Sequence, residues 1–178
     1  MKLLVIRHGE SEADLLNVHE GRADFSLTVR GHKQAAAMAD YVAENYSISK
    51  IYASTLTRAK QTARHLSDKT GVPIVLDENL MEFNNGLLAG LSRTAAKEKY
   101  PKIPNVPIDK AVYGQESQLA FRQRAENALA RIIREAHPEE TIAVVSHWFE
   151  TEQGIHRVLG ELARCGNQFV GDMKEYLL

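Results

Sequence analysis

Histidine and arginine side chains follow three short apolar segments of the sequence, close to the point where each segment ends. Arg7 and His8 come directly after the first segment, Arg58 comes shortly after the second, and His147 comes directly after the last. A guanidinium group donates hydrogen bonds in a fork that matches the oxygens of a phosphate group. An imidazole can act as a nucleophile or as a hydrogen-bond donor. These residue types are suited to phosphate chemistry, provided that the chain brings the four side chains together.

Each of these residues taken alone has a simpler explanation. A single histidine at a strand end is usually a hydrogen-bonded structural residue, and a single arginine on a helix is usually solvated. Surface arginines have no reason to gather at the ends of central strands, whereas a phosphate site requires them there. The joint pattern therefore favours a functional site over four separate structural roles.

The elements that must position these side chains alternate along the sequence. Short apolar runs rich in β-branched residues predict strands at 2–6, 50–54, 73–77 and 141–146. Amphipathic segments predict one helix capped by Thr28 that runs to about Asn45, and further helices at 56–70, 118–136 and 149–160. The polar stretch 7–27 contains no predicted element, 84–115 is predicted to be loop-rich around one short helix, and 161–178 shows no clear period and no evident strand.

This alternation predicts a three-layer α/β/α fold with a mostly parallel central sheet. Ligands of such sheets bind outside the carboxyl ends of the strands. Because the histidines and arginines follow predicted strands, we expect them to meet at that edge of the sheet.

Composition limits the classes of function. The chain has 178 residues, a hydrophobic share of 44%, a charged share of 25% and a net charge of −1, as expected for one globular domain that binds neither nucleic acid nor membranes. Cys165 is the only cysteine, which excludes an internal disulfide and a cysteine-based zinc site. The first apolar run is too short for a signal peptide, so a cytoplasmic location is expected. The sequence does not fix the oligomeric state, and a homodimer is left open.

Five segments occur in an order that resembles the histidine phosphatase superfamily, which contains the cofactor-dependent phosphoglycerate mutases and small phosphatases. They are RHGESEAD, LTVRG, YASTLTRAKQTA, the glutamate in DENLMEFNNGLLAGLS, and VVSH. The resemblance implies a phosphoglycerate mutase-like fold for a single domain over residues 1–178. It fades from about residue 148.

The resemblance also implies a mechanism. His8 would attack phosphorus and form a phosphohistidine. Arg7, Arg58 and His147 would bind the phosphoryl oxygens and offset the charge that develops during transfer. Glu82 would protonate the leaving alkoxide and then deprotonate the attacking water. Neither a metal nor a cofactor is required.

The segment around Glu82 resembles the branch of the superfamily that acts on phosphate monoesters, and not the short phosphohistidine phosphatases, which lack this acid. The stretch 83–146 is shorter than the corresponding part of the mutases, which favours a phosphatase acting on a small phosphorylated metabolite. Two alternatives stay open: a mutase-type phosphotransferase, and a catalytically weakened phosphate-binding or scaffold member. A metal hydrolase is disfavoured, because the remaining histidines show no metal-binding spacing; these are His19, His32, His65, His137 and His156.

Three positions depart from the pattern. Asp14 stands where the family usually has an asparagine, and its carboxylate would repel phosphate where an amide would bind it. Asn17 is expected to bind phosphate in its place. Ser26 replaces the usual proline. Trp148 stands where the family has glycine, and we expect it to reduce turnover without abolishing phosphate binding, which is the feature that favours the scaffold alternative.

Overall fold

The structure, a computed structural model, describes residues 1–147 and 168–170. In this part of the chain five strands form one sheet in the order β3-β2-β4-β1-β5, and every neighbouring pair is parallel. The strands are β1 (Lys2–Arg7), β2 (Lys50–Ser54), β3 (Ile74–Asp77), β4 (Thr141–Ser146) and β5 (Gln168–Val170). The four strands expected from the sequence are therefore present.

The fifth strand corrects the sequence analysis, which found no strand near the C-terminus. β5 has only 3 residues, and it pairs with Lys2, Leu3 and Leu4 of β1. So short a segment carries no visible alternation. The strand is identified by its pairing with β1.

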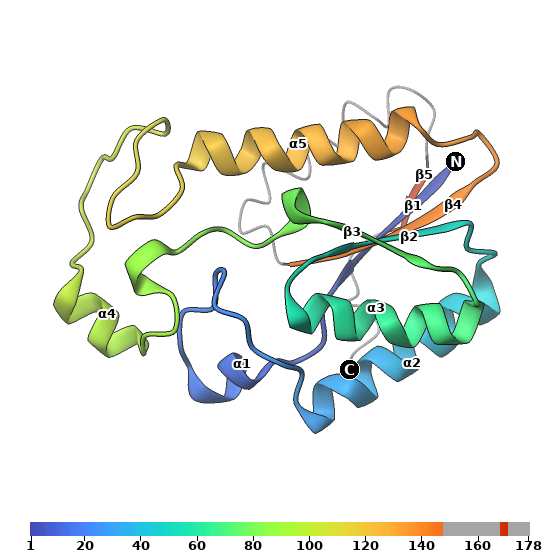
Figure 1. The fold of residues 1–178 in the computed structure, drawn as a ribbon, viewed down its shortest axis with the longest axis horizontal. Helices are drawn as coiled ribbons and strands as arrows, with labels where there is room; N and C mark the ends of the chain where they lie inside the picture. The colour runs from blue at the N-terminus through green and yellow to red at the C-terminus, as the bar shows by residue number, and fades with distance from the viewer. Residues whose placement is uncertain (148–167, 171–178) are drawn as a thin grey trace.

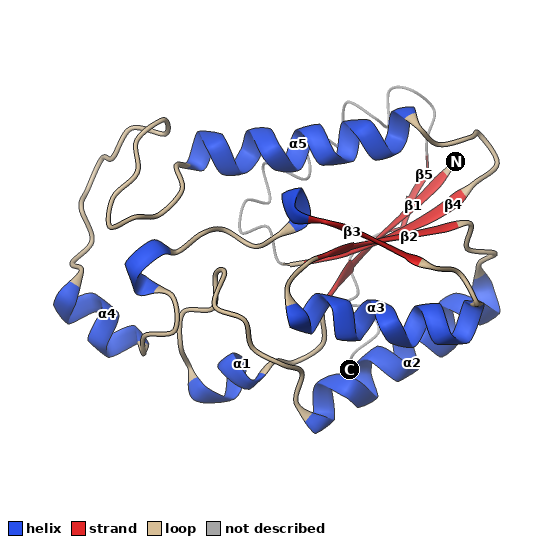
Figure 2. Ribbon diagram, viewed as in Figure 1, coloured by secondary structure: helices blue, strands red, loops and turns tan. Residues whose placement is uncertain are grey.

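Five α-helices cover the sheet and its carboxyl edge in the described part of the chain (Figure 2). They are α1 (Glu12–Leu16), α2 (Val29–Asn45), α3 (Thr57–Thr70), α4 (Arg93–Lys99) and α5 (Gln118–Arg134), with the 3₁₀ turns η1 (Glu78–Leu80) and η2 (Gly86–Leu88). The sequence predicted all of the long helices but not α1, whose 5 residues are started by a capping box between Ser11 and Asp14.

The helices make three layers with the sheet (Figure 1). α2 and α3 pack on one face through Met38, Val42 and Leu66 against Ile6 and Val145. α5 packs on the other face, where Leu129 and Ile132 meet Leu3, Ile142 and Val144. Both faces of the central strands are thus buried, as a parallel sheet requires, and the predicted three-layer α/β/α fold is confirmed.

The start of α2 holds the loop that follows β1. Thr28 caps α2 by accepting a hydrogen bond from the Gly31 amide at 2.9 Å, as predicted. The same loop contains Gly9, where a Cβ atom would lie 2.5 Å from the Gly31 carbonyl oxygen. Only a glycine at position 9 permits this approach of the loop to the helix.

The predicted helix 149–160 and Trp148 lie outside the described residues, so the expectations placed on them stay predictions. None of the helices within the described ranges is long and apolar enough to cross a membrane.

Candidate active site

The register of two central strands places His8 beside His147. Arg7, the last residue of β1, pairs with Ser146, the last residue of β4, and the His8 amide donates to the Ser146 carbonyl oxygen at 3.0 Å. The next residue of each strand is therefore a histidine at the same edge of the sheet. Both rings are buried, with their centroids 5.0 Å apart.

Two contacts define the chemical state of His8. Nδ1 lies 2.7 Å from the carbonyl oxygen of Gly9, and Nε2 accepts a hydrogen bond from Arg58 Nε at 3.2 Å. These contacts fit one neutral tautomer, with the proton on Nδ1 and the lone pair on Nε2. Burial, and next the charge of Arg58, lower the pKa of His8 to about 3. At neutral pH the imidazole is therefore uncharged, as a nucleophile must be, and its Nε2 lone pair accepts the hydrogen bond of Arg58.

The two ring nitrogens of His147 differ in their contacts with the described residues. Its Nε2 lies 2.8 Å from the Ser54 hydroxyl, which itself accepts from the Leu56 amide at 3.3 Å. Its Nδ1 is buried and has no hydrogen-bond partner among the residues that the structure describes. Burial, followed by Arg58 and His8, lowers the pKa of His147 well below the usual value. When Ser54 donates to Nε2, the ring proton is on Nδ1, a buried donor that a ligand oxygen would satisfy.

Arg58 is held in the first turn of α3 and is fully buried. Its terminal nitrogens donate to the carbonyl oxygens of Ala23 at 3.2 Å and Gly21 at 3.0 Å. The Thr62 hydroxyl donates to the Arg58 carbonyl at 2.8 Å and accepts from the Gly9 amide at 3.1 Å, which ties α3 to the loop that carries His8. Burial lowers the pKa of Arg58, and the carboxylate of Glu20 opposes that shift.

Glu82 approaches the same edge of the sheet from the segment after β3 and η1. One of its carboxylate oxygens accepts from the Phe83 amide at 2.8 Å, and its charge opposes the lowering of the pKa of Arg58. Glu82 and Arg7 line one cavity of about 710 Å³ at this end of the molecule. A cavity of this size accommodates a small metabolite.

The segment that carries Glu82 is fastened by Arg124 of α5, a residue that the sequence analysis did not identify. The Arg124 guanidinium donates to the carbonyl oxygens of Asn79, Met81 and Glu82 at 2.9, 2.6 and 2.9 Å. It also donates to Glu116 at 2.6 Å. These hydrogen bonds fix the position of the backbone that carries Glu82.

Asp14 and Asn17 lie on the wall of the same cavity. Asp14 accepts from the Ser11 amide at 2.8 Å and lies 3.8 Å from Arg7, so its carboxylate serves the start of α1. Asn17 ends α1 with a left-handed φ of 51°, and its side-chain oxygen accepts from Arg93 at 2.9 Å. Phosphate binding by Asn17 stays a prediction.

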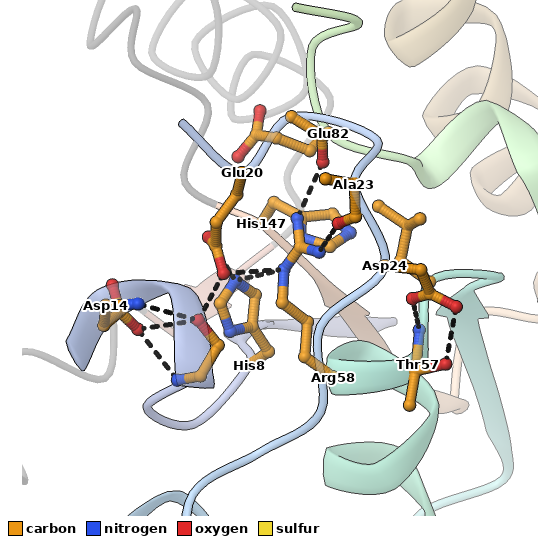
Figure 3. Close-up of polar contacts among 12 residues, drawn as sticks. His8, Asp14, Glu20, Ala23, Asp24, Thr57, Arg58, Glu82 and His147 are labelled. Carbon is orange, nitrogen blue, oxygen red and sulfur yellow. Dashed lines mark hydrogen bonds and ion pairs between the residues drawn. The ribbon is translucent and has the colours of Figure 1, made fainter. Parts of the chain in front are cut away.

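Glu20 is a second residue of this site, after Arg124, that the sequence analysis missed. Its two carboxylate oxygens lie 4.0 Å from His8 Nε2 and 3.5 Å from Arg58 Nε (Figure 3). In the sequence Glu20 is one acid in a polar stretch, without periodicity or a predicted element around it. Only the fold shows that the loop returns to the strand ends.

The other histidines in the described part of the chain lie away from this cluster or on its outer wall. His32 and His65 contact each other between α2 and α3 at 3.1 Å, His137 is exposed, and His19 lines the cavity. Within residues 1–147 and 168–170, no group of three or more histidine, cysteine or acidic side chains could hold a metal ion.

Comparison with known proteins identifies relatives along most of the chain. The model of the histidine phosphatase superfamily (branch 1) matches residues 3–163. Phosphoserine phosphatase 1 of Hydrogenobacter thermophilus is 28% identical over 83% of this chain and 71% of its own length. Phosphoglycerate mutase-like protein 4 of Arabidopsis thaliana is 31% identical over 92% of this chain and 71% of its own length.

A solved structure shows the same fold. The putative α-ribazole-5′-phosphate phosphatase of Escherichia coli superposes with a TM-score of 0.77 at 29% identity, over 88% of this chain and 79% of that one. The family match covers both histidines of the site and the strands that carry them. The chain belongs to branch 1 of the histidine phosphatase superfamily.

Proposed function

We propose that the protein is a phosphatase that hydrolyses small phosphate monoesters through a phosphohistidine intermediate. One observation carries the proposal: a neutral imidazole, His8, presents the lone pair of Nε2 beside a buried guanidinium, with Nε of Arg58 at 3.2 Å. A nucleophilic side chain and a side chain that can bind phosphate are thereby held next to each other. The buried Nδ1 of His147, which has no partner within residues 1–147 and 168–170, supplies a further hydrogen bond for a phosphoryl oxygen.

The reaction proceeds in two displacements at phosphorus. His8 Nε2 forms a bond to phosphorus as the bond to the ester oxygen breaks, and protonated Glu82 donates its proton to the departing alkoxide. Water then attacks the phosphohistidine, Glu82 takes a proton from that water, and the N–P bond breaks. Inorganic phosphate leaves, and His8 and Glu82 return to their starting states. Arg7, Arg58 and His147 bind the phosphoryl oxygens in both steps.

Two relatives support hydrolysis of a small phosphorylated metabolite, since one is named a phosphoserine phosphatase and another a putative α-ribazole-5′-phosphate phosphatase. A small phosphorylated metabolite as the substrate, a cytoplasmic location and a homodimer stay predictions.

The proposal is tested with a panel of alkyl and aryl phosphate monoesters, with and without a chelator, by measuring released phosphate. Release from several monoesters that is insensitive to chelator is the expected result. Transfer of the phosphoryl group to a sugar acid in place of water would instead assign the mutase-type alternative. Phosphate binding without release would assign the scaffold alternative.

Replacing His147 with alanine is expected to reduce kcat about 10²- to 10³-fold, on the scale of removing one donor from an oxyanion site. Because the lost Nδ1 donor also serves the bound product, inhibition by inorganic phosphate should weaken. His137→Ala is the matched control, since His137 is exposed and outside the site. Steady-state kinetics with phosphate as inhibitor measure both quantities, and unchanged kinetics in His147→Ala would exclude His147 from the site.

A further inference from the structure

We infer that Glu20 occupies the anion site of the protein at rest, and that its carboxylate must be displaced before a phosphate group can bind. The inference rests on the phosphate site of the proposed function and adds a residue that sets how tightly that site binds its ligand. It begins from the position of the carboxylate, which points toward the His8 ring and the Arg58 guanidinium (Figure 3).

The distances put negative charge where a phosphoryl oxygen would lie. Glu20 Oε2 is 4.0 Å from the nucleophilic nitrogen of His8, and Glu20 Oε1 is 3.5 Å from Arg58 Nε. The Glu20 side chain is only 16% exposed. A phosphate dianion brought to His8 would therefore meet a like charge at short range in a poorly solvated site, and like charges at about 4 Å repel strongly there. The two anions cannot share the position.

The electrostatics of Arg58 show what Glu20 does in the resting protein. A fully buried guanidinium needs a compensating charge, because burial disfavours its charged form. The charge of Glu20 is the leading influence that opposes the lowering of the pKa of Arg58 by burial. Phosphate, with a larger negative charge, can take over this role.

The hydrogen bonding of Glu20 allows it to leave. The hydroxyl of Ser11 contacts the Glu20 carboxylate and also lies 3.2 Å from Asp14 Oδ2. A hydroxyl has one proton to donate, so Ser11 can serve only one of the two carboxylates at a time. When Glu20 moves away, Ser11 donates to Asp14 and remains satisfied. Glu20 also lines the cavity of about 710 Å³, which gives the displaced side chain access to water.

Replacing Glu20 with glutamine tests the inference. The amide has nearly the shape of the carboxylate but no charge, and its NH₂ group can donate to phosphate. We expect the Kd for inorganic phosphate, measured by isothermal titration calorimetry, to fall at least about tenfold relative to the unsubstituted protein. Glu20→Ala, which removes the competing group altogether, should also bind phosphate more tightly. Glu12→Gln is the matched control, because Glu12 is exposed on α1 and its replacement removes the same charge from the same segment.

Three results would overturn the inference. Unchanged or weaker phosphate binding in both Glu20 variants would make Glu20 a permanent partner of Arg58. A selective loss of turnover on alkyl phosphates without tighter phosphate binding would make Glu20 a proton donor. Loss of the folded state in both variants, measured by thermal unfolding, would assign Glu20 a structural role.

The binding measurement separates this inference from the proposed function. Tighter phosphate binding by Glu20→Gln in a protein that hydrolyses no monoester would support the anion site and refute the phosphatase. Hydrolysis that depends on His8, together with unchanged phosphate binding in Glu20→Gln, would support the phosphatase and refute the role of Glu20.

Discussion

Replacing His8 with alanine is expected to lower the turnover of phosphate monoesters by about four to six orders of magnitude, the scale on which enzymes lose activity with their nucleophile. The expectation follows from the neutral tautomer, in which the only lone pair of the ring lies on Nε2 beside Arg58. With that nitrogen removed, the site retains cations that bind phosphate but nothing that can form the covalent intermediate. The effect should therefore appear in kcat, while phosphate binding is largely preserved.

Trapping the intermediate provides the second measurement for His8. A reaction stopped with substrate present should leave a phosphoryl group that is labile in acid and stable in base, on the peptide that contains residues 7 and 8. His8→Asn is the companion variant, because an asparagine side chain can still donate to the Gly9 carbonyl oxygen and keep the loop in place. A label on serine or aspartate, or full activity in either variant, would contradict the assignment.

Replacing Glu82 with glutamine should reduce kcat for alkyl phosphates about 10²- to 10⁴-fold, the usual contribution of a general acid. The same change should affect nitrophenyl phosphate much less, because nitrophenolate is a stable leaving group that needs little protonation. Because a general acid acts in its protonated form, turnover of alkyl phosphates by the unsubstituted protein should fall as pH rises through the pKa of that acid. This pH dependence should disappear in Glu82→Gln.

The control for Glu82 is available in the same segment. Glu78 lies in the 3₁₀ turn η1 and is exposed, and the site contacts described above do not involve it. Glu78→Gln should therefore leave the ratio of the kcat values for alkyl and nitrophenyl phosphate unchanged. If Glu82→Gln lowers kcat equally for alkyl and nitrophenyl phosphate, Glu82 does not act by proton transfer.

The layers of the fold could be predicted because burial on both faces makes each central strand a short apolar run. The amphipathic period of α2, α3 and α5 was equally visible in the sequence. The two elements that were missed, α1 and β5, have 5 and 3 residues. At such lengths periodicity is absent, and the conformation is decided by a capping box in one case and by pairing with β1 in the other.

The site could be predicted only where its residues directly follow strands or lie in one of the five segments that resemble the histidine phosphatase superfamily. His8 and His147 meet because β1 and β4 are neighbours in register, which a strand-end argument anticipates. Glu20 and Arg124 could not be found in this way. Tertiary contacts bring each of them to the site. The loop that carries Glu20 is held by hydrogen bonds from Arg58 to its carbonyl groups, and Arg124 reaches the site through its hydrogen bonds to the carbonyl groups of Asn79 and Met81.

The pairing of β1 with β4 also governs when the site can form during folding. Lys2 is in register with Thr141 of β4 and with Gln168 of β5, so neither edge of the N-terminal strand has a partner until nearly the whole described chain exists. Contacts between such distant segments carry a large loop-closure cost and form slowly. On the ribosome, β2, α3 and β3 are complete well before β4 emerges, and until then both edges of β1 are unpaired, a state that is prone to aggregation. His8 and His147 therefore cannot come together before β4 has been synthesised and paired with β1, so catalytic competence has to arise late in the synthesis of the chain.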